Sequence, residues 1–102
     1  MRIQIHAQDP ELPPEFRTFA EARVAETLAY MADRLTLVEV HIKDVNGQKH
    51  GVDKRCVIEA RPRGMDPVAV EHQAAQAKDA LVKAADKLKS VLTSRFGRLE
   101  AR

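Results

Sequence analysis

Hydrophobic and polar residues alternate in separate stretches of the chain, and this alternation predicts strands with one buried side. The first stretch is residues 2–8, where isoleucine and alanine alternate with arginine, glutamine and histidine. Residues 36–45 and 54–61 have the same period. A shorter run at 68–72 places valine at alternate positions and predicts a fourth strand.

Apolar residues spaced three and four apart predict two helices, over residues 14–33 and about residues 72–95. Pro13 and Pro14 suit the approach to the first helix, because a missing backbone N–H costs little in a first turn. Gly97 is a plausible C-terminal stop for the second helix.

The expected order is β-α-β-β-β-α, an α+β fold with two helices packed on one face of a four-stranded mixed sheet. The first two strands should be parallel, since a helix joins them by a right-handed crossover, and the later hairpins antiparallel. Asn46 and Gly47 predict a turn, in a loop that also carries Lys49 and His50. The other sheet face should be open and polar. We expect it to carry Arg2, Gln4, His6, Glu39, His41, Lys43, Arg55, Val57, Glu59 and Arg61.

Composition is compatible with one domain over residues 1–102. No run approaches the roughly 18 apolar residues of a membrane span, and the N-terminus has no signal-peptide pattern, so we expect a cytoplasmic protein. The net charge is only +2, but it is unevenly distributed. Residues 1–40 hold four basic against seven acidic side chains, whereas residues 78–102 hold seven against three. The basic end indicates a surface for phosphates.

Two groups of basic residues are candidates for binding RNA. Lys83 and Lys87 lie four apart on the outer face of the second helix. Lys54 and Arg55 belong to the hairpin at 43–63, which would add a second basic surface. The alternative for Lys83 is an ordinary solvated helix face, in which it pairs with neighbouring aspartates. Few aromatic residues are available, so recognition of RNA backbone and shape fits better than base stacking.

Residues for catalysis or metal binding lack the spacing that such chemistry needs. His6 and His41 could be neighbours on the open face, but no metal motif such as H-E-x-x-H is present. Cys56 lies on the apolar side of its strand, where a cysteine usually behaves as a small hydrophobe. We therefore expect a binding protein rather than an enzyme, with no catalytic residue, no metal, no cofactor and no small-molecule substrate.

Motifs along the chain resemble those of the ribosome hibernation-promoting and ribosome-associated inhibitor proteins, also called sigma-54 modulation proteins. The first helix has the family's pattern as Phe16-Arg17-x-Phe19-x-Glu21-x-Arg23-Val24. The following strand has Thr36-x-Val38-x-Val40, and the last helix has Ala80-Leu81 and Asp86-Lys87-Leu88. The hairpin is similar to a branch of the family with the pattern N-G-x-x-x-G-x-D-K-R-C. The resemblance runs nearly end to end.

The resemblance implies a protein that binds the small ribosomal subunit and its rRNA between head and body, where it overlaps mRNA and tRNA positions and silences or protects idle ribosomes under stress. It assigns rRNA binding to Arg17, Arg23 and Lys87; Lys83, Lys54 and Arg55 are added from charge and geometry. Family members often have an aromatic residue where Lys78 stands. We expect no C-terminal dimerisation domain and a monomer off the ribosome. The alternative function is a protein-binding regulator that contacts an acidic partner through the open sheet face.

Overall fold

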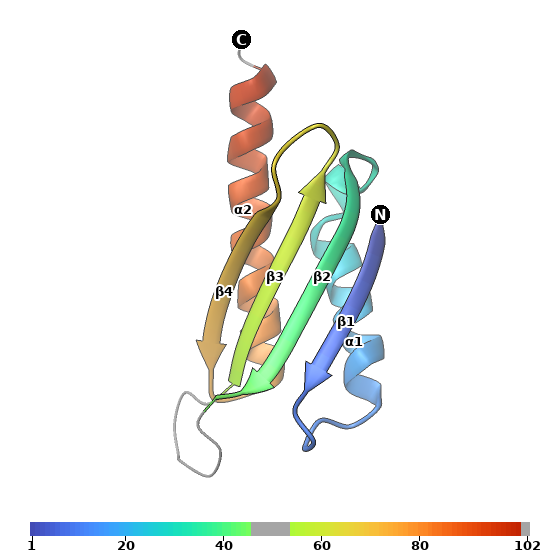
Figure 1. The fold of residues 1–102 in the computed structure, drawn as a ribbon, viewed down its shortest axis with the longest axis vertical. Coiled ribbons are helices and arrows are strands. Elements are labelled where there is room, and N and C mark those ends of the chain that lie inside the picture. The colour runs from blue at the N-terminus through green and yellow to red at the C-terminus, as the bar shows by residue number, and fades with distance from the viewer. Residues whose placement is uncertain (46–53, 101–102) are drawn as a thin grey trace.

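The computed structural model describes residues 1–45 and 54–100, and both of its α-helices cover the same face of a four-stranded sheet (Figure 1). The expected fold class and element order are confirmed. The elements are β1 (Arg2–Gln8), α1 (Glu15–Thr27), the 3-10 helix η1 (Ala29–Arg34), β2 (Leu35–Asp44), β3 (Lys54–Pro62), β4 (Val68–Ala74) and α2 (Ala77–Glu100).

The strands lie in sequence order, β1-β2-β3-β4, with β1 parallel to β2 and the other pairs antiparallel. In this register Ile5 lies opposite Val40, and Val40 lies opposite Ile58. The three side chains therefore point to the same side, towards the helices. Between β3 and β4 the chain turns at Gly64, whose φ of 70° is a left-handed conformation that glycine adopts without strain.

The core lies between the sheet and the helices. α2 covers β3 and β4, whereas α1 lies against β1 (Figure 1). Val24 and Leu28 from the α1 side and Leu81 and Leu88 from α2 are fully buried. Cys56 is also fully buried, as its position on the apolar side of β3 predicts. Within the described residues, no helix combines the length and the apolar composition that crossing a membrane would need.

Both helix predictions were wrong at their ends. The first helix was expected to run to residue 33, but α1 stops at Thr27 and the chain continues as η1. The tighter 3-10 turns bring the chain back so that β2 can begin at Leu35. The second helix starts later than expected, because residues 72–74 pair with β3. It also continues through Gly97, since one glycine weakens a helix without ending it. The Asn46–Gly47 turn and the loop around Lys49 lie outside the described residues.

Candidate nucleic-acid interface

Lys83 and Lys87 lie on the flank of α2 that borders β4, and both are exposed. Lys87 Nζ donates a hydrogen bond to the main-chain oxygen of Glu71 in β4, at 3.0 Å. Among the ion pairs between described residues, none joins Lys83 to Asp79 or Asp86. Lys83 therefore forms no ion pair with either neighbouring aspartate, and its exposed side chain is compatible with the binding interpretation and with the solvated helix face.

His72 lies close enough to both Lys83 and Lys87 to sense their positive charges. Burial lowers the pKa of His72, and the positive charges of Lys87 and Lys83 lower it further. Its Nδ1 atom is shielded from solvent and has no hydrogen-bond partner. Two unneutralised cations and an uncharged imidazole thus make a local positive potential beside the β4 edge, which would attract an anion.

A second basic row follows the line where α1 and η1 face α2, and we call it the interhelix seam. Its cations each stack on an aromatic ring, an arrangement that orients the charge while leaving it partly solvated. The contacts are Lys78 over Phe19 at 4.8 Å, Lys89 over Tyr30 at 5.7 Å and Arg34 over Phe96 at 3.9 Å, each measured to the ring centre.

Arg23 belongs to this seam. It follows Phe19 by four residues on the same flank of α1, between the Lys78–Phe19 and Lys89–Tyr30 contacts, and its side chain is half-buried. Although Arg23 follows the apolar stripe of α1, its half-buried side chain lies at the surface between the helices. Tyr30 is 90% exposed and borders a hollow of about 420 Å³ that Lys89 and Phe96 also line. An exposed ring beside cations can stack on a nucleobase.

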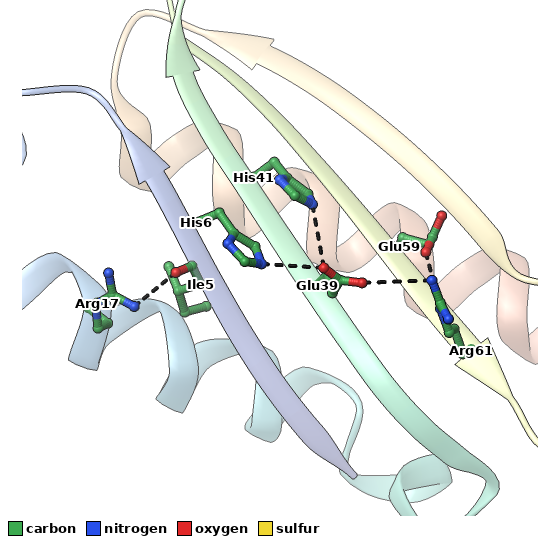
Figure 2. Close-up of polar contacts among 7 residues, drawn as sticks. All are labelled: Ile5, His6, Arg17, Glu39, His41, Glu59 and Arg61. Atoms are coloured by element: carbon green, nitrogen blue, oxygen red, sulfur yellow. Dashed lines mark hydrogen bonds and ion pairs between the residues drawn. The ribbon is translucent and has the colours of Figure 1, made fainter.

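Arg17 and Arg55 lie apart from both rows. Arg17 is on the opposite flank of α1 from the seam, and its Nη1 donates to the main-chain oxygen of Ile5 in β1, at 2.8 Å (Figure 2). Arg55 lies on the open sheet face, where its guanidinium forms an ion pair with Glu71. The six candidate residues therefore do not converge on one point, and only Lys83 and Lys87 are brought together.

Lys54 is inside the protein rather than on a binding surface. Its side chain is 10% exposed, and Nζ lies 2.6 Å from the fully buried Asp9 Oδ2 and 3.6 Å from Asp44 Oδ2. Position 54 is on the same side of β3 as Cys56, which is the side that the helices cover. With these carboxylates already around it, the ammonium is not available to a phosphate. The pKa of Lys54 is raised above its ordinary value, mainly by the hydrogen bond to Asp9.

The open sheet face carries a compact polar group. The rings of His6 and His41 stack at 4.6 Å, which confirms the prediction that they are neighbours. Both Nε2 atoms face the same oxygen of Glu39, Oε2, at 3.3 and 3.9 Å, while Oε1 lies 3.9 Å from Arg61 (Figure 2). Negative side chains thus offset positive ones on this face, so it has no excess of cations to match that of the helix side.

Sequence reasoning missed most of the interhelix seam. Lys78 and Lys89 are eleven residues apart, about three helical turns, and this spacing indicates that they share a flank of α2 distinct from that of Lys83 and Lys87. The sequence does not indicate that this flank faces α1. Nothing in the sequence indicated that Arg34 would lie over Phe96, because that contact depends on the end of α1 and the start of η1.

Comparisons with known proteins identify the family and similar folds. Residues 3–100 match the family model described as Sigma 54 modulation protein / S30EA ribosomal protein. A ribosomal subunit interface protein from Coxiella burnetii has a similar structure, with a TM-score of 0.78, 15% identity, and 95% of this chain and 99% of that one covered. The N-terminal domain of Protein Y from Thermus thermophilus gives a TM-score of 0.71, 23% identity and coverages of 94% and 99%. No curated protein is significantly similar in sequence.

Proposed function

Because the chain belongs to the sigma 54 modulation protein / S30EA ribosomal protein family, we propose that it associates with the ribosome, binding rRNA of the small subunit with its helix-covered side. The family that the motifs resemble is confirmed by the match over residues 3–100. This match is the observation that carries the proposal. The similar solved structures support the fold alone, and the distribution of charge supports the choice of surface.

The helix-covered side offers cations in two rows, one on each flank of α2. Lys83 and Lys87 form one row, and the interhelix seam with Arg23 forms the other. Asp79 and Asp86 lie exposed between the two rows on α2, so a phosphate backbone is attracted to the flanks of the helix and repelled from its outer crest. Such an arrangement recognises shape rather than sequence, with Tyr30 available to stack on one unpaired base.

The candidate residues contribute unequally to this surface. Arg23, Lys83 and Lys87 are on the helix-covered side, and Arg17 extends the surface towards β1. Arg55 belongs to the opposite face, where Glu71 already pairs with it. Lys54 belongs to the interior and has a structural role.

The mechanism requires no chemical step. A protein that occupies the region of the small subunit where mRNA and tRNA lie silences translation by exclusion, and it also shields idle ribosomes. Because its affinity comes from neutralising phosphates, the complex should be sensitive to salt, with about one unit of slope in log K against log[salt] for each contact.

Co-sedimentation with ribosomal subunits and whole ribosomes from the source organism tests the proposal. At low salt the protein should sediment with the small subunit and leave it as salt is raised. Lys83→Glu together with Lys87→Glu should abolish binding at moderate salt, and Lys83→Gln with Lys87→Gln should reduce the salt slope by about two. Translation of a reporter mRNA in vitro should fall when the wild-type protein is added.

The matched control is Arg2→Glu with Lys43→Glu, which makes the same change of charge at two exposed positions of the open face. Ribosome binding should survive in this variant. Binding that is lost in the control but kept in the Lys83 and Lys87 variant would assign the interaction to the open sheet face and favour a protein-binding regulator. A protein that stays at the top of the gradient under all these conditions would refute ribosome association.

A further inference from the structure

Three side chains with metal-binding atoms meet on the open face because of the strand register. His6 of β1 lies directly opposite His41 of β2, and Glu39 precedes His41 by two residues on the same side of β2. One donor atom from each lies within 4.8 Å of the other two. None of the three is adjacent to another in sequence, so no sequence motif indicates this group.

The spacing of these donor atoms is close to that of a coordinated ion. A tetrahedral Zn²⁺ site with metal–ligand bonds of about 2.0–2.1 Å holds its donor atoms about 3.4 Å apart. His6 Nε2 is already 3.3 Å from Glu39 Oε2, and His41 Nε2 is 3.9 Å from the same oxygen. Side-chain rotations that bring the two imidazole nitrogens together by at most about 1.4 Å would complete the triangle.

Without a bound ion, one of these donor atoms has no hydrogen-bond partner. His6 Nε2 is shielded from solvent and, although it faces Glu39, it is not aligned for a hydrogen bond. A shielded nitrogen without a partner is unfavourable, and coordination would satisfy it. The two imidazole rings already lie side by side, with an angle of 13° between their planes, and they must tilt towards each other for both in-plane nitrogen lone pairs to reach one ion.

Arg61 lies beside the carboxylate oxygen of Glu39 that faces away from the histidines. Its Nη2 lies 3.9 Å from Glu39 Oε1, and its Nε lies 3.4 Å from Glu59 Oε1 (Figure 2). The guanidinium thus faces the outer oxygen of Glu39, and Oε2 is left facing the two histidines. Ligating carboxylates in metal sites regularly have an outer polar partner, and Arg61 is placed to serve as one for Glu39. Glu59 offsets part of the positive charge of Arg61, which would otherwise disfavour a cation nearby.

We propose that His6, Glu39 and His41 form a binding site for a divalent transition-metal ion, with Zn²⁺ as the ion best matched to two imidazoles and one carboxylate. Borderline metals prefer such nitrogen and oxygen ligands, whereas Mg²⁺ and Ca²⁺ prefer oxygen alone. The two histidines and Glu39 are partly exposed, so solvent can reach the fourth position. The site is on the face opposite the interhelix seam, and the ion and an RNA could therefore be bound together.

Calorimetric titration of the untagged, full-length protein with ZnCl₂ tests this site. One ion should bind per chain. His6→Gln and His41→Gln should each weaken binding by at least about tenfold, since changes even in the outer contacts of a metal site cost that much. Replacing Zn²⁺ with Co²⁺ should give the visible absorption of a tetrahedral or five-coordinate ion in the wild type and not in the His6→Gln, His41→Gln double variant.

His72→Gln is the matched control, because it removes a histidine from the helix side of the sheet; His50→Gln tests the remaining histidine of the chain. Both variants should bind Zn²⁺ as the wild type does. Circular dichroism and a thermal melt without metal establish that each variant is folded, and Zn²⁺ should raise the melting temperature only of proteins that keep the site. Equal affinity in the wild type and the double variant, or no saturable binding in the wild type, would overturn the proposal.

Discussion

Replacing Lys54 with methionine distinguishes a structural role from a role in RNA binding. Methionine has a similar length and fits an apolar strand face, but it removes the ammonium that lies between Asp9, Asp44 and Glu11. If Lys54 contacted phosphate, Lys54→Met would weaken ribosome binding and leave the fold intact. The structure leads to the opposite expectation.

The size of the expected loss of stability in Lys54→Met follows from the burial of the ion pair. Asp9 is fully buried and Lys54 is 10% exposed, so the pair is nearly removed from water. Removing one partner of a buried pair costs about 3–5 kcal/mol, because the other charge is left without compensation. Glu11 is well exposed and contributes little to this cost. We expect a loss near 3 kcal/mol, which at an m-value of about 1.5 kcal/mol/M lowers the urea midpoint by about 2 M.

The pH dependence supplies a second measurement. Burial raises the pKa of Asp9, but the hydrogen bonds from Lys54 and from the Glu11 backbone N–H outweigh it and hold the pKa below its ordinary value. The folded state therefore binds fewer protons at Asp9 than the unfolded state does. This contribution is complete above the unfolded-state value of about 3.9 and is lost as pH falls towards the folded-state pKa. The difference between wild type and Lys54→Met should thus shrink in acid.

Urea unfolding followed by circular dichroism at neutral pH and near pH 3 measures both effects. Lys43→Met is the control, since it makes the same substitution at an exposed position of the neighbouring strand and should change stability by less than about 0.5 kcal/mol. An unchanged midpoint in Lys54→Met, accompanied by weaker ribosome binding, would refute the structural role.

Three further predictions concern other buried or paired groups. Burial raises the pKa of the Cys56 thiol to about 12, so iodoacetamide should modify Cys56 at neutral pH only slowly and at the full rate in urea; rapid modification of the folded protein would contradict its burial. The NMR titration of His72 should give a pKa below that of an ordinary histidine, and Lys83→Gln should raise it, whereas an unshifted value would mean that the imidazole is solvated. Since its folded-state pKa is depressed, His72 stabilises the fold above about pH 6.5 and this contribution is lost as pH falls. Arg17→Ala should cost about 0.5–1 kcal/mol in urea unfolding through the lost hydrogen bond to Ile5, and no change would show that water replaces it fully.

The strands could be predicted closely because alternation is the direct result of burying one side of a sheet. β1 has the bounds that its sequence predicts, β2 begins and ends one residue earlier than predicted, β3 ends one residue later, and β4 ends two residues later. Helix ends depend on what they pack against, which a local pattern does not contain. His72 fits the helical period, yet it is a strand residue because Cys56 lies opposite it in β3.

In the candidate site, too, relations within one element could be predicted and relations between elements could not. Lys83 and Lys87 could be identified because both lie on one helix, whose period fixes their relation. Lys54 was assigned to an exposed surface, although it lies two residues before Cys56 and therefore points to the same, buried side of the strand. Its partner Asp9 is 45 positions away in the sequence, and only the β1–β2–β3 register brings the two side chains together. Cross-strand relations of this kind also join His6 to His41.

The division of the sheet into a covered face and an open face has an evolutionary consequence. The covered face needs only aliphatic side chains of suitable volume, and many combinations satisfy that condition. The open face carries none of the main core, so its residues can be exchanged without repacking the interior. Relatives can therefore diverge until few positions are shared and still keep this arrangement of strands and helices, while each lineage places different chemistry on the exposed side of the same sheet.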